Sequence, residues 1–160
     1  MDVILRIDEP FAEAVSPDPV KRAVRETVQF LAHDENRFSV VTVVITGSGP
    51  VRELNRQYRG VDAPTDVLSF ENSQDPDFPQ PDSEKNKHLG DIVIAYPIAH
   101  EQAAARGHGV LEEIVLLAVH ATLHLLGFGH DRPDNKEQMW AAQNQIMAQL
   151  SLSHVKPTET

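Results

Sequence analysis

Three histidines in segment 120–130, read HATLHLLGFGH, have the spacing of a metal site. His120 and His124 are four residues apart, so on a helix their side chains lie one turn apart on the same face. Two imidazoles in this arrangement can bind one zinc ion, and a glycine turn at Gly127 lets His130 return as a third ligand. Three protein ligands leave the fourth position for water, as in catalytic zinc sites, so we expect one Zn²⁺ per chain.

The alternative is that these histidines make separate hydrogen bonds in the core. The chain has 8 histidines among 160 residues, and the helix expected around His120 is apolar over much of its circumference. Buried imidazoles need polar partners, and a metal ion satisfies both at once, which favours the metal site. The chain has no cysteine, which excludes disulfides and thiolate chemistry and leaves His, Asp and Glu as metal ligands.

A second group of chemically informative residues, Arg52, Arg56 and Arg59, lines one face of a predicted helix. Like charges at this spacing repel each other, and a polyanionic ligand would relieve the repulsion. The alternative is an ordinary solvated face, on which Glu53 and other acids neutralise the arginines. Arg59 differs from the other two because it ends the helix beside Gly60.

The segments around these residues predict four strands and about five helices. Runs rich in β-branched residues predict strands at 3–7, 38–46, 66–71 and 90–95. Helical spacing, with proline starts and glycine stops, predicts helices at about 17–32, 50–60, 97–106, 110–126 and 133–150. We therefore expect a single α+β (mixed α/β) domain over residues 1–155, with the metal site at the end of a central helix. Segment 72–88 is predicted to be a mobile loop, and 156–160 a C-terminal tail.

Composition limits the cellular setting of the protein. A net charge of −10 argues against general nucleic-acid binding, although the acids are concentrated after residue 60, which leaves room for a local basic face before it. The N-terminal MDVILR lacks the positive start and apolar run of a signal peptide. The longest uncharged apolar stretch, 114–129, is shorter than the roughly 20 residues of a spanning helix. We expect a cytoplasmic protein that does not contact a membrane.

Four segments of the chain resemble the YbeY family of bacterial endoribonucleases, the rRNA maturation factors. They read LNRQYRG at 54–60, PTDVLSFE at 64–71, LGDIVIA at 89–95 and VHATLHLLGFGH at 119–130. The resemblance implies a metal-dependent endonuclease for single-stranded RNA, acting in small-subunit (16S) rRNA maturation and ribosome quality control. It also implies His120, His124 and His130 as zinc ligands and Arg59 as the catalytic arginine.

The chain departs from the pattern of that family at two positions. Ala121 stands where the family usually has glycine, and Gly129 stands where it usually has aspartate, just before the third histidine. If that aspartate orients a ligand or moves a proton, the role is vacant here. Asp131 is the nearest substitute, although it would point in a different direction, so the general base is unassigned.

The expected reaction is hydrolysis of an RNA phosphodiester. Zinc would lower the pKa of its bound water from about 15.7 toward 7, and Arg59 would hold the scissile phosphate. Asp91 is a candidate partner for a ligand histidine, or simply a turn residue at the start of a strand. Glu113 lies on the same helical face as His120, but a salt bridge to another helix is the simpler interpretation.

Two other functions compete with this interpretation. A ribosome-associated binding factor could hold a structural zinc whose fourth ligand, such as Asp131, closes the site. A small metallopeptidase is disfavoured because Ala121 replaces the glutamate that serves as general base in H-E-x-x-H proteases. Under the endoribonuclease interpretation the partners are the RNA of the small ribosomal subunit and, with it, ribosomal proteins.

Overall fold

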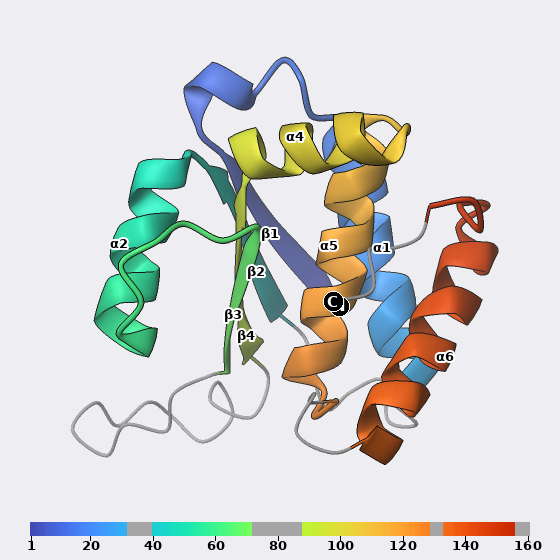
Figure 1. Ribbon diagram of the computed structural model, residues 1–160. Coiled ribbons are helices and arrows are strands. Elements are labelled where there is room, and N and C mark those ends of the chain that lie inside the picture. Colours follow the sequence, from blue (N-terminus) through green and yellow to red (C-terminus); the bar gives the residue numbers. More distant parts are fainter. Residues whose placement is uncertain (32–39, 72–87, 129–132, 156–160) are drawn as a thin grey trace.

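The protein folds around a four-stranded mixed sheet (Figure 1). The structure is a computed structural model and describes residues 1–31, 40–71, 88–128 and 133–155. Along the chain the elements are β1 (Asp2–Ile7), η1 (Glu9–Phe11), α1 (Pro17–Leu31), β2 (Val40–Thr46), α2 (Ser48–Arg59), β3 (Val67–Glu71), β4 (His88–Ala95), α4 (Tyr96–Arg106), α5 (Val110–Leu125) and α6 (Pro133–Gln149). The strand order is β1-β2-β4-β3, in which β3 is the antiparallel edge strand and the other three are parallel.

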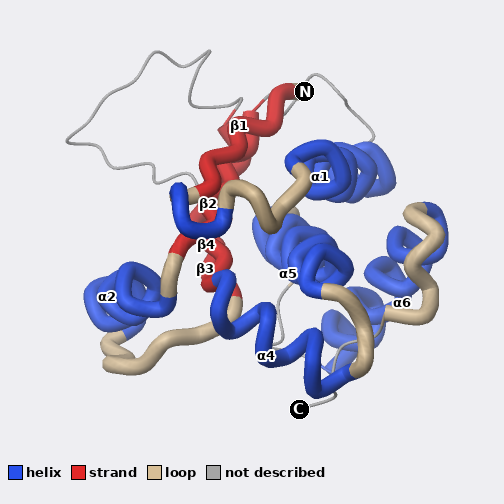
Figure 2. The backbone as a smooth tube through the Cα atoms, turned by 90° about the horizontal axis from the view of Figure 1, so that it is seen from above, coloured by secondary structure: helices blue, strands red, loops and turns tan. Residues whose placement is uncertain are grey.

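The helices cover both faces of this sheet. Figure 2 shows α2 on one face, α1, α5 and α6 on the other, and α4 crossing the end of the sheet. Alternate residues of β4 accordingly enter different cores: Ile92 and Ile94 pack with α1, α5 and α6, while Val93 packs in a smaller cluster with Val51 of α2. The two faces therefore have separate hydrophobic cores, and a residue's position along β4 decides which helix it contacts.

Helix α5 is the central element of the larger core. Its residues from Glu113 to Val119 are buried without interruption, because the sheet, α1, α4 and α6 surround it. This explains why its sequence is apolar over much of its circumference rather than along one stripe. Among the described residues no single helix is long and apolar enough to cross a membrane; α4 and α5 meet the length and composition test only as a pair bent by 112°.

The predicted fold class is confirmed, with four strands and five α-helices in the described part of the chain. The short helix η1 was not predicted. Strand β4 begins at His88, so the prediction of a loop over 72–88 is wrong at its last residue. The reason is tertiary: His88 pairs with Val40 of β2 across an irregular register, which the local sequence does not reveal. The remainder of that loop, 72–87, and the tail 156–160 lie outside the described residues.

Candidate metal centre

His120 and His124 lie together on α5, as their spacing predicts. Their Nε2 atoms are 3.2 Å apart, and their rings meet edge to face at 73° with centroids 4.8 Å apart. Two nitrogens bound to one tetrahedral zinc at 2.0–2.1 Å would be separated by about 3.3 Å, so the observed pair fits such a site closely. The distance also permits a hydrogen bond between the two imidazoles, by which the pair can share a proton when no metal is bound.

A glutamine on α6 fixes the orientation of the first histidine. Gln143 Oε1 lies 3.0 Å from His120 Nδ1, and the glutamine is only 1% exposed. A buried carbonyl oxygen accepts a hydrogen bond from Nδ1–H, and this places the lone pair of the imidazole on Nε2, the atom that faces His124. The Gln143 amide nitrogen is buried and has no hydrogen-bond partner within the described part of the chain. The position of Gln143 therefore satisfies His120 Nδ1, while the amide nitrogen of the glutamine is left without a hydrogen bond in this part of the chain.

Sequence reasoning missed Gln143, although a signal was present. The residue falls at helical spacing among Met139, Ala142, Ile146 and Met147, which are all buried. A polar residue on the apolar face of a helix requires a buried partner, and a histidine on a neighbouring helix is a natural one. What the sequence does not show is that α6 packs against α5 at the level of His120.

Helix α5 ends in a left-handed turn at Gly127, as predicted. Gly127 has a φ of +103°, its N–H donates to His124 O at 3.0 Å, and the N–H of Phe128 donates to Leu123 O at 3.1 Å. These two bonds form a Schellman motif, in which the left-handed position favours glycine. His130, Gly129 and Asp131 lie outside the described residues, and within those residues no three metal-binding side chains come together.

Arg59 is the last residue of α2 and is exposed. Its guanidinium has no carboxylate partner among the residues that the structure describes. Helices α2 and α5 end at the same end of the sheet (Figure 1), but on opposite faces of it (Figure 2). The edge strand β3 lies between them and contacts both. The structure thus brings Arg59, His120 and His124 to one end of the molecule, on either side of β3.

The other two arginines of α2 are neutralised by acids. Arg52 Nε lies 2.7 Å from Asp62 Oδ1, and Arg56 binds both carboxylate oxygens of Glu53. Hydrogen bonds from these arginines lower the pKa of Asp62 and of Glu53 below their usual values. The ordinary solvated face is therefore the better interpretation of Arg52 and Arg56, and Arg59 is the arginine of this helix whose charge is available to an anion.

Two carboxylates considered from the sequence have other partners. Asp91 lies 3.3 Å from His88. It follows Gly90, whose position contacts α5, so Asp91 points to the opposite face of the sheet from His120 and His124. Glu113 is completely buried and binds Arg106 at 2.7 Å and His108 at 2.5 Å, which is the salt bridge to the preceding helix expected as the simpler alternative.

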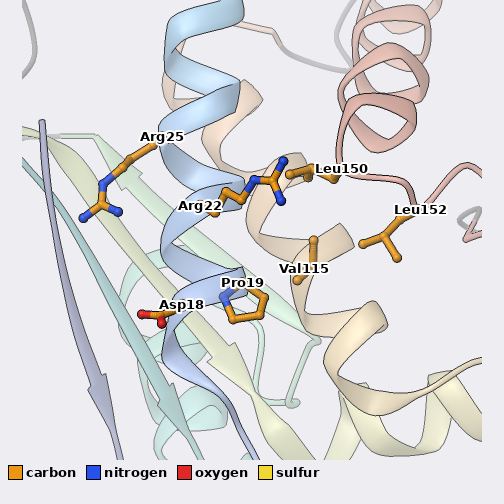
Figure 3. Close-up of a pocket in the computed structure, with 7 residues that line it drawn as sticks. All are labelled: Asp18, Pro19, Arg22, Arg25, Val115, Leu150 and Leu152. Carbon is orange, nitrogen blue, oxygen red and sulfur yellow. The ribbon is translucent and has the colours of Figure 1, made fainter.

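A pocket of about 440 Å³ lies elsewhere on the molecule, between α1 and the segment after α6 (Figure 3). Its apolar side chains include Val115 of α5, and Arg22 reaches over it from α1. Val115 and His124 are nine residues apart, or two and a half helical turns, so they point to opposite sides of α5. The pocket is therefore separate from the candidate metal centre.

The amino-acid sequence is similar to those of known endoribonucleases. A sequence model described as "Endoribonuclease YbeY" matches residues 8–151. The chain is 42% identical over 138 residues to the endoribonuclease YbeY of Dehalococcoides mccartyi, covering 81% of this chain and 78% of the relative. It is 38% identical over 152 residues to that of Roseiflexus castenholzii, covering 94% of each.

A solved structure supports the fold independently. The solution structure of a Thermotoga maritima protein matches with a TM-score of 0.52 and 22% identity, covering 98% of this chain and 99% of that one. At this identity the likeness concerns the fold alone, whereas the matches in sequence extend over nearly the whole chain at higher identity. The chain belongs to the endoribonuclease YbeY family.

Proposed function

We propose that this chain is a zinc-dependent endoribonuclease that hydrolyses single-stranded RNA. Its place in the YbeY family supports RNA as the substrate and phosphodiester hydrolysis as the reaction. The observation that carries the metal dependence is the 3.2 Å separation of the Nε2 atoms of His120 and His124, together with the buried oxygen that fixes the tautomer of His120. The proposed setting is the cytoplasm, where the enzyme would mature 16S rRNA and act in ribosome quality control.

In this proposal His120, His124 and His130 hold the metal. A zinc ion held by these three imidazoles would supply hydroxide at neutral pH, because it would lower the pKa of a bound water to about 7. Gln143 would keep His120 in the tautomer that presents Nε2, and the turn at Gly127 ends α5 three residues before His130. Gln143 and Gly127 therefore each have a proposed part in forming the site.

Arg59 is proposed to bind the phosphate. A guanidinium can donate two parallel hydrogen bonds to phosphate oxygens and keeps its charge at every physiological pH. The other two arginines of α2 are paired with acids, so Arg59 gives the exposed end of this helix a local positive charge in a chain of net charge −10. We propose that this end receives the RNA, with the small ribosomal subunit and its proteins supplying further contacts.

The sequence from His120 to His124, HATLH, contains no glutamate. Ala121, which occupies the position of the general base in H-E-x-x-H proteases, is 1% exposed in the core of α5. A methyl group in the core cannot move a proton, which argues against a peptidase that uses that machinery. The structural-zinc factor differs from the proposed enzyme in coordination, since a fourth protein ligand would replace water.

The test is cleavage of matched single-stranded and duplex RNA by the purified protein, before and after chelation and after zinc is restored. The proposal predicts cleavage of the single strand alone, loss with the chelator, and recovery with zinc. X-ray absorption at the zinc edge on the same sample should show three imidazole nitrogens and one water oxygen. Zinc-loaded protein that cleaves neither RNA, with a fourth protein ligand on the metal, would instead establish the structural role.

A further inference from the structure

Two exposed hydrophobic side chains lie close to Arg59 in the chain. In the described part of the chain four large hydrophobic residues are exposed, and they fall into two pairs: Met1 at 37% with Ile4 at 55%, and Tyr58 at 67% with Val61 at 49%. The first pair belongs to β1 and the residue before it, at one edge of the sheet. The second pair flanks Arg59 at the C-terminal end of α2, near the opposite edge of the sheet, which is formed by β3. Arg59, which is proposed to bind the phosphate, is therefore bordered by exposed apolar surface.

The ring of Tyr58 is supported on one side by a second aromatic ring. It packs against Phe70 of β3, with ring centroids 5.1 Å apart and a tilt of 58°. The turn that follows is also fixed, because the amide of Asn55 donates to Ala63 O at 2.8 Å and Gly60 adopts the left-handed cap. An aromatic ring supported by a second ring, and otherwise open to solvent, is suited to receive a flat partner on its exposed side.

The sheet register places this ring at the level of the metal centre. Phe70, which supports Tyr58, pairs with Asp91. The neighbouring residue Gly90 packs against the side chain of Leu125, the residue that follows His124 on α5. Tyr58 and the C-terminal turn of α5 thus lie at the same level on opposite faces of the edge of the sheet. A strand of RNA that passes around this edge can contact both.

We propose that Tyr58 is a base-stacking platform for an unpaired nucleotide next to the phosphate held by Arg59. This inference rests on the proposed function and adds to it a cause for the preference for single strands. A base in a duplex is already stacked on both faces, whereas an unpaired base can turn out onto an aromatic ring. Stacking is also largely indifferent to base identity and does not require a basic surface, which suits a chain whose net charge of −10 weakens attraction by charge alone.

Two substitutions of Tyr58 distinguish the effect of its aromatic face from the effect of its apolar volume. Tyr58→Phe keeps the aromatic face, and Tyr58→Leu keeps an apolar contact with Phe70 but removes the face. We expect Tyr58→Phe to match the wild type, and Tyr58→Leu to raise the KM for single-stranded RNA by about 5- to 100-fold, with kcat and melting temperature nearly unchanged. Ile4→Ala is the matched control, since it removes exposed apolar surface at the other edge of the sheet and should leave KM unchanged.

Substrates that carry one abasic nucleotide complete the test. When the abasic nucleotide is at the position that stacks on Tyr58, it should raise the KM of the wild type by the same factor as Tyr58→Leu does on the intact substrate. The two changes together should raise KM no more than either alone. An unchanged KM in Tyr58→Leu, or purely additive losses at every abasic position, would overturn the platform. Those outcomes leave cleavage by the wild type intact, whereas a wild type that cleaves no single-stranded RNA would overturn the proposed function and the platform together.

Discussion

Gln143 on α6 accepts a hydrogen bond from the imidazole Nδ1 of His120 on α5 across 3.0 Å. This contact joins two helices that are separated in the sequence by the turn at Gly127. It also determines which nitrogen of His120 faces His124. The geometry of the candidate metal centre therefore depends on the packing of α6 as well as on the spacing of histidines within α5.

Replacing Gln143 should weaken metal binding without removing a ligand. Gln143→Leu leaves Nδ1–H of His120 without its acceptor and frees the choice of tautomer. We expect the zinc affinity to fall by about 10- to 100-fold, the usual cost of losing such a partner, as measured by competition with a chromophoric chelator. Gln145→Leu, at an exposed position of the same helix, is the control and should bind zinc as the wild type does.

Arg59 should be separable from the metal. Because it is exposed and ends α2, Arg59→Ala should keep the zinc content and melting temperature of the wild type. Single-turnover cleavage should fall by about 10²–10³, as for the loss of one transition-state contact, and Arg59→Lys should recover only part of it because an ammonium lacks the guanidinium fork. Full activity in Arg59→Ala would place the phosphate elsewhere, with Arg52 and Arg56 as the next candidates.

Much of the fold was predictable because local patterns and tertiary packing agree. The β-branched run of β2 and the proline and glycine boundaries of α4 gave their positions to within a few residues. Helix α5 was located by length and by its glycine limits, since periodicity is weak in a helix buried on all sides. Strand β4 was less predictable at its start, because the pairing of His88 with Val40 depends on a strand that is distant in the sequence.

The site was predictable only in the part that lies on one element. The spacing of His120 and His124 is a property of a single helix, and the structure brings them together as expected. Gln143 is supplied by another helix, and its role follows from packing that the sequence does not encode locally. The two interpretations of Asp91 could not be separated from the sequence for a related reason: one residue of displacement along β4 turns a side chain to the other face of the sheet.

Gly90 sets the close approach of the sheet to the end of α5. A β-carbon at this position would overlap the backbone oxygen of Phe70 and lie 2.7 Å from Leu125 Cδ2. Gly90→Ala should therefore lower the free energy of unfolding by about 1–3 kcal/mol, the usual cost of overpacking, and weaken zinc binding by shifting the turn that carries His124.

Gly49→Ala is the matched control for this steric argument. An added β-carbon there would have no atom within 4 Å, and alanine favours the helix in which the residue lies. It should leave the free energy of unfolding unchanged or raise it by up to about 1 kcal/mol. Chemical denaturation of both variants gives the comparison, and equal stability of Gly90→Ala and wild type would contradict the packing described here.

Glu112 gives the stability a defined pH dependence. Its carboxylate accepts from the backbone N–H of Gly109 at 2.9 Å and contacts His154 at 2.5 Å, and these hydrogen bonds hold its pKa below the usual value of 4.5. A lowered pKa means that the ionised form stabilises the fold. This contribution is present above the usual pKa and disappears as the pH falls through the lowered one.

Glu112→Gln keeps an acceptor for Gly109 but removes the charge. It should lower the free energy of unfolding by about 0.5–1 kcal/mol at pH 7, and the difference from wild type should shrink as the pH falls below the usual pKa of 4.5. Urea denaturation at a series of pH values measures this difference. Glu101→Gln is the control, because the carboxylate of Glu101 forms no ion pair with the residues described. It should leave the free energy of unfolding at pH 7 nearly unchanged. A difference that persists unchanged at pH 3 would show that the charge is not its cause.

The central claim is that the histidines at the end of α5 hold the metal on which RNA cleavage depends. The most direct measurement is stepwise addition of zinc to metal-free protein, with bound metal and the single-turnover rate on single-stranded RNA recorded at each step. The account predicts that the rate rises in proportion to bound zinc and saturates at one ion per chain, and that His124→Ala shows neither binding nor cleavage while His100→Ala, at an exposed position, behaves as wild type. Full cleavage by the metal-free protein, or undiminished zinc binding and cleavage in His124→Ala, would contradict it.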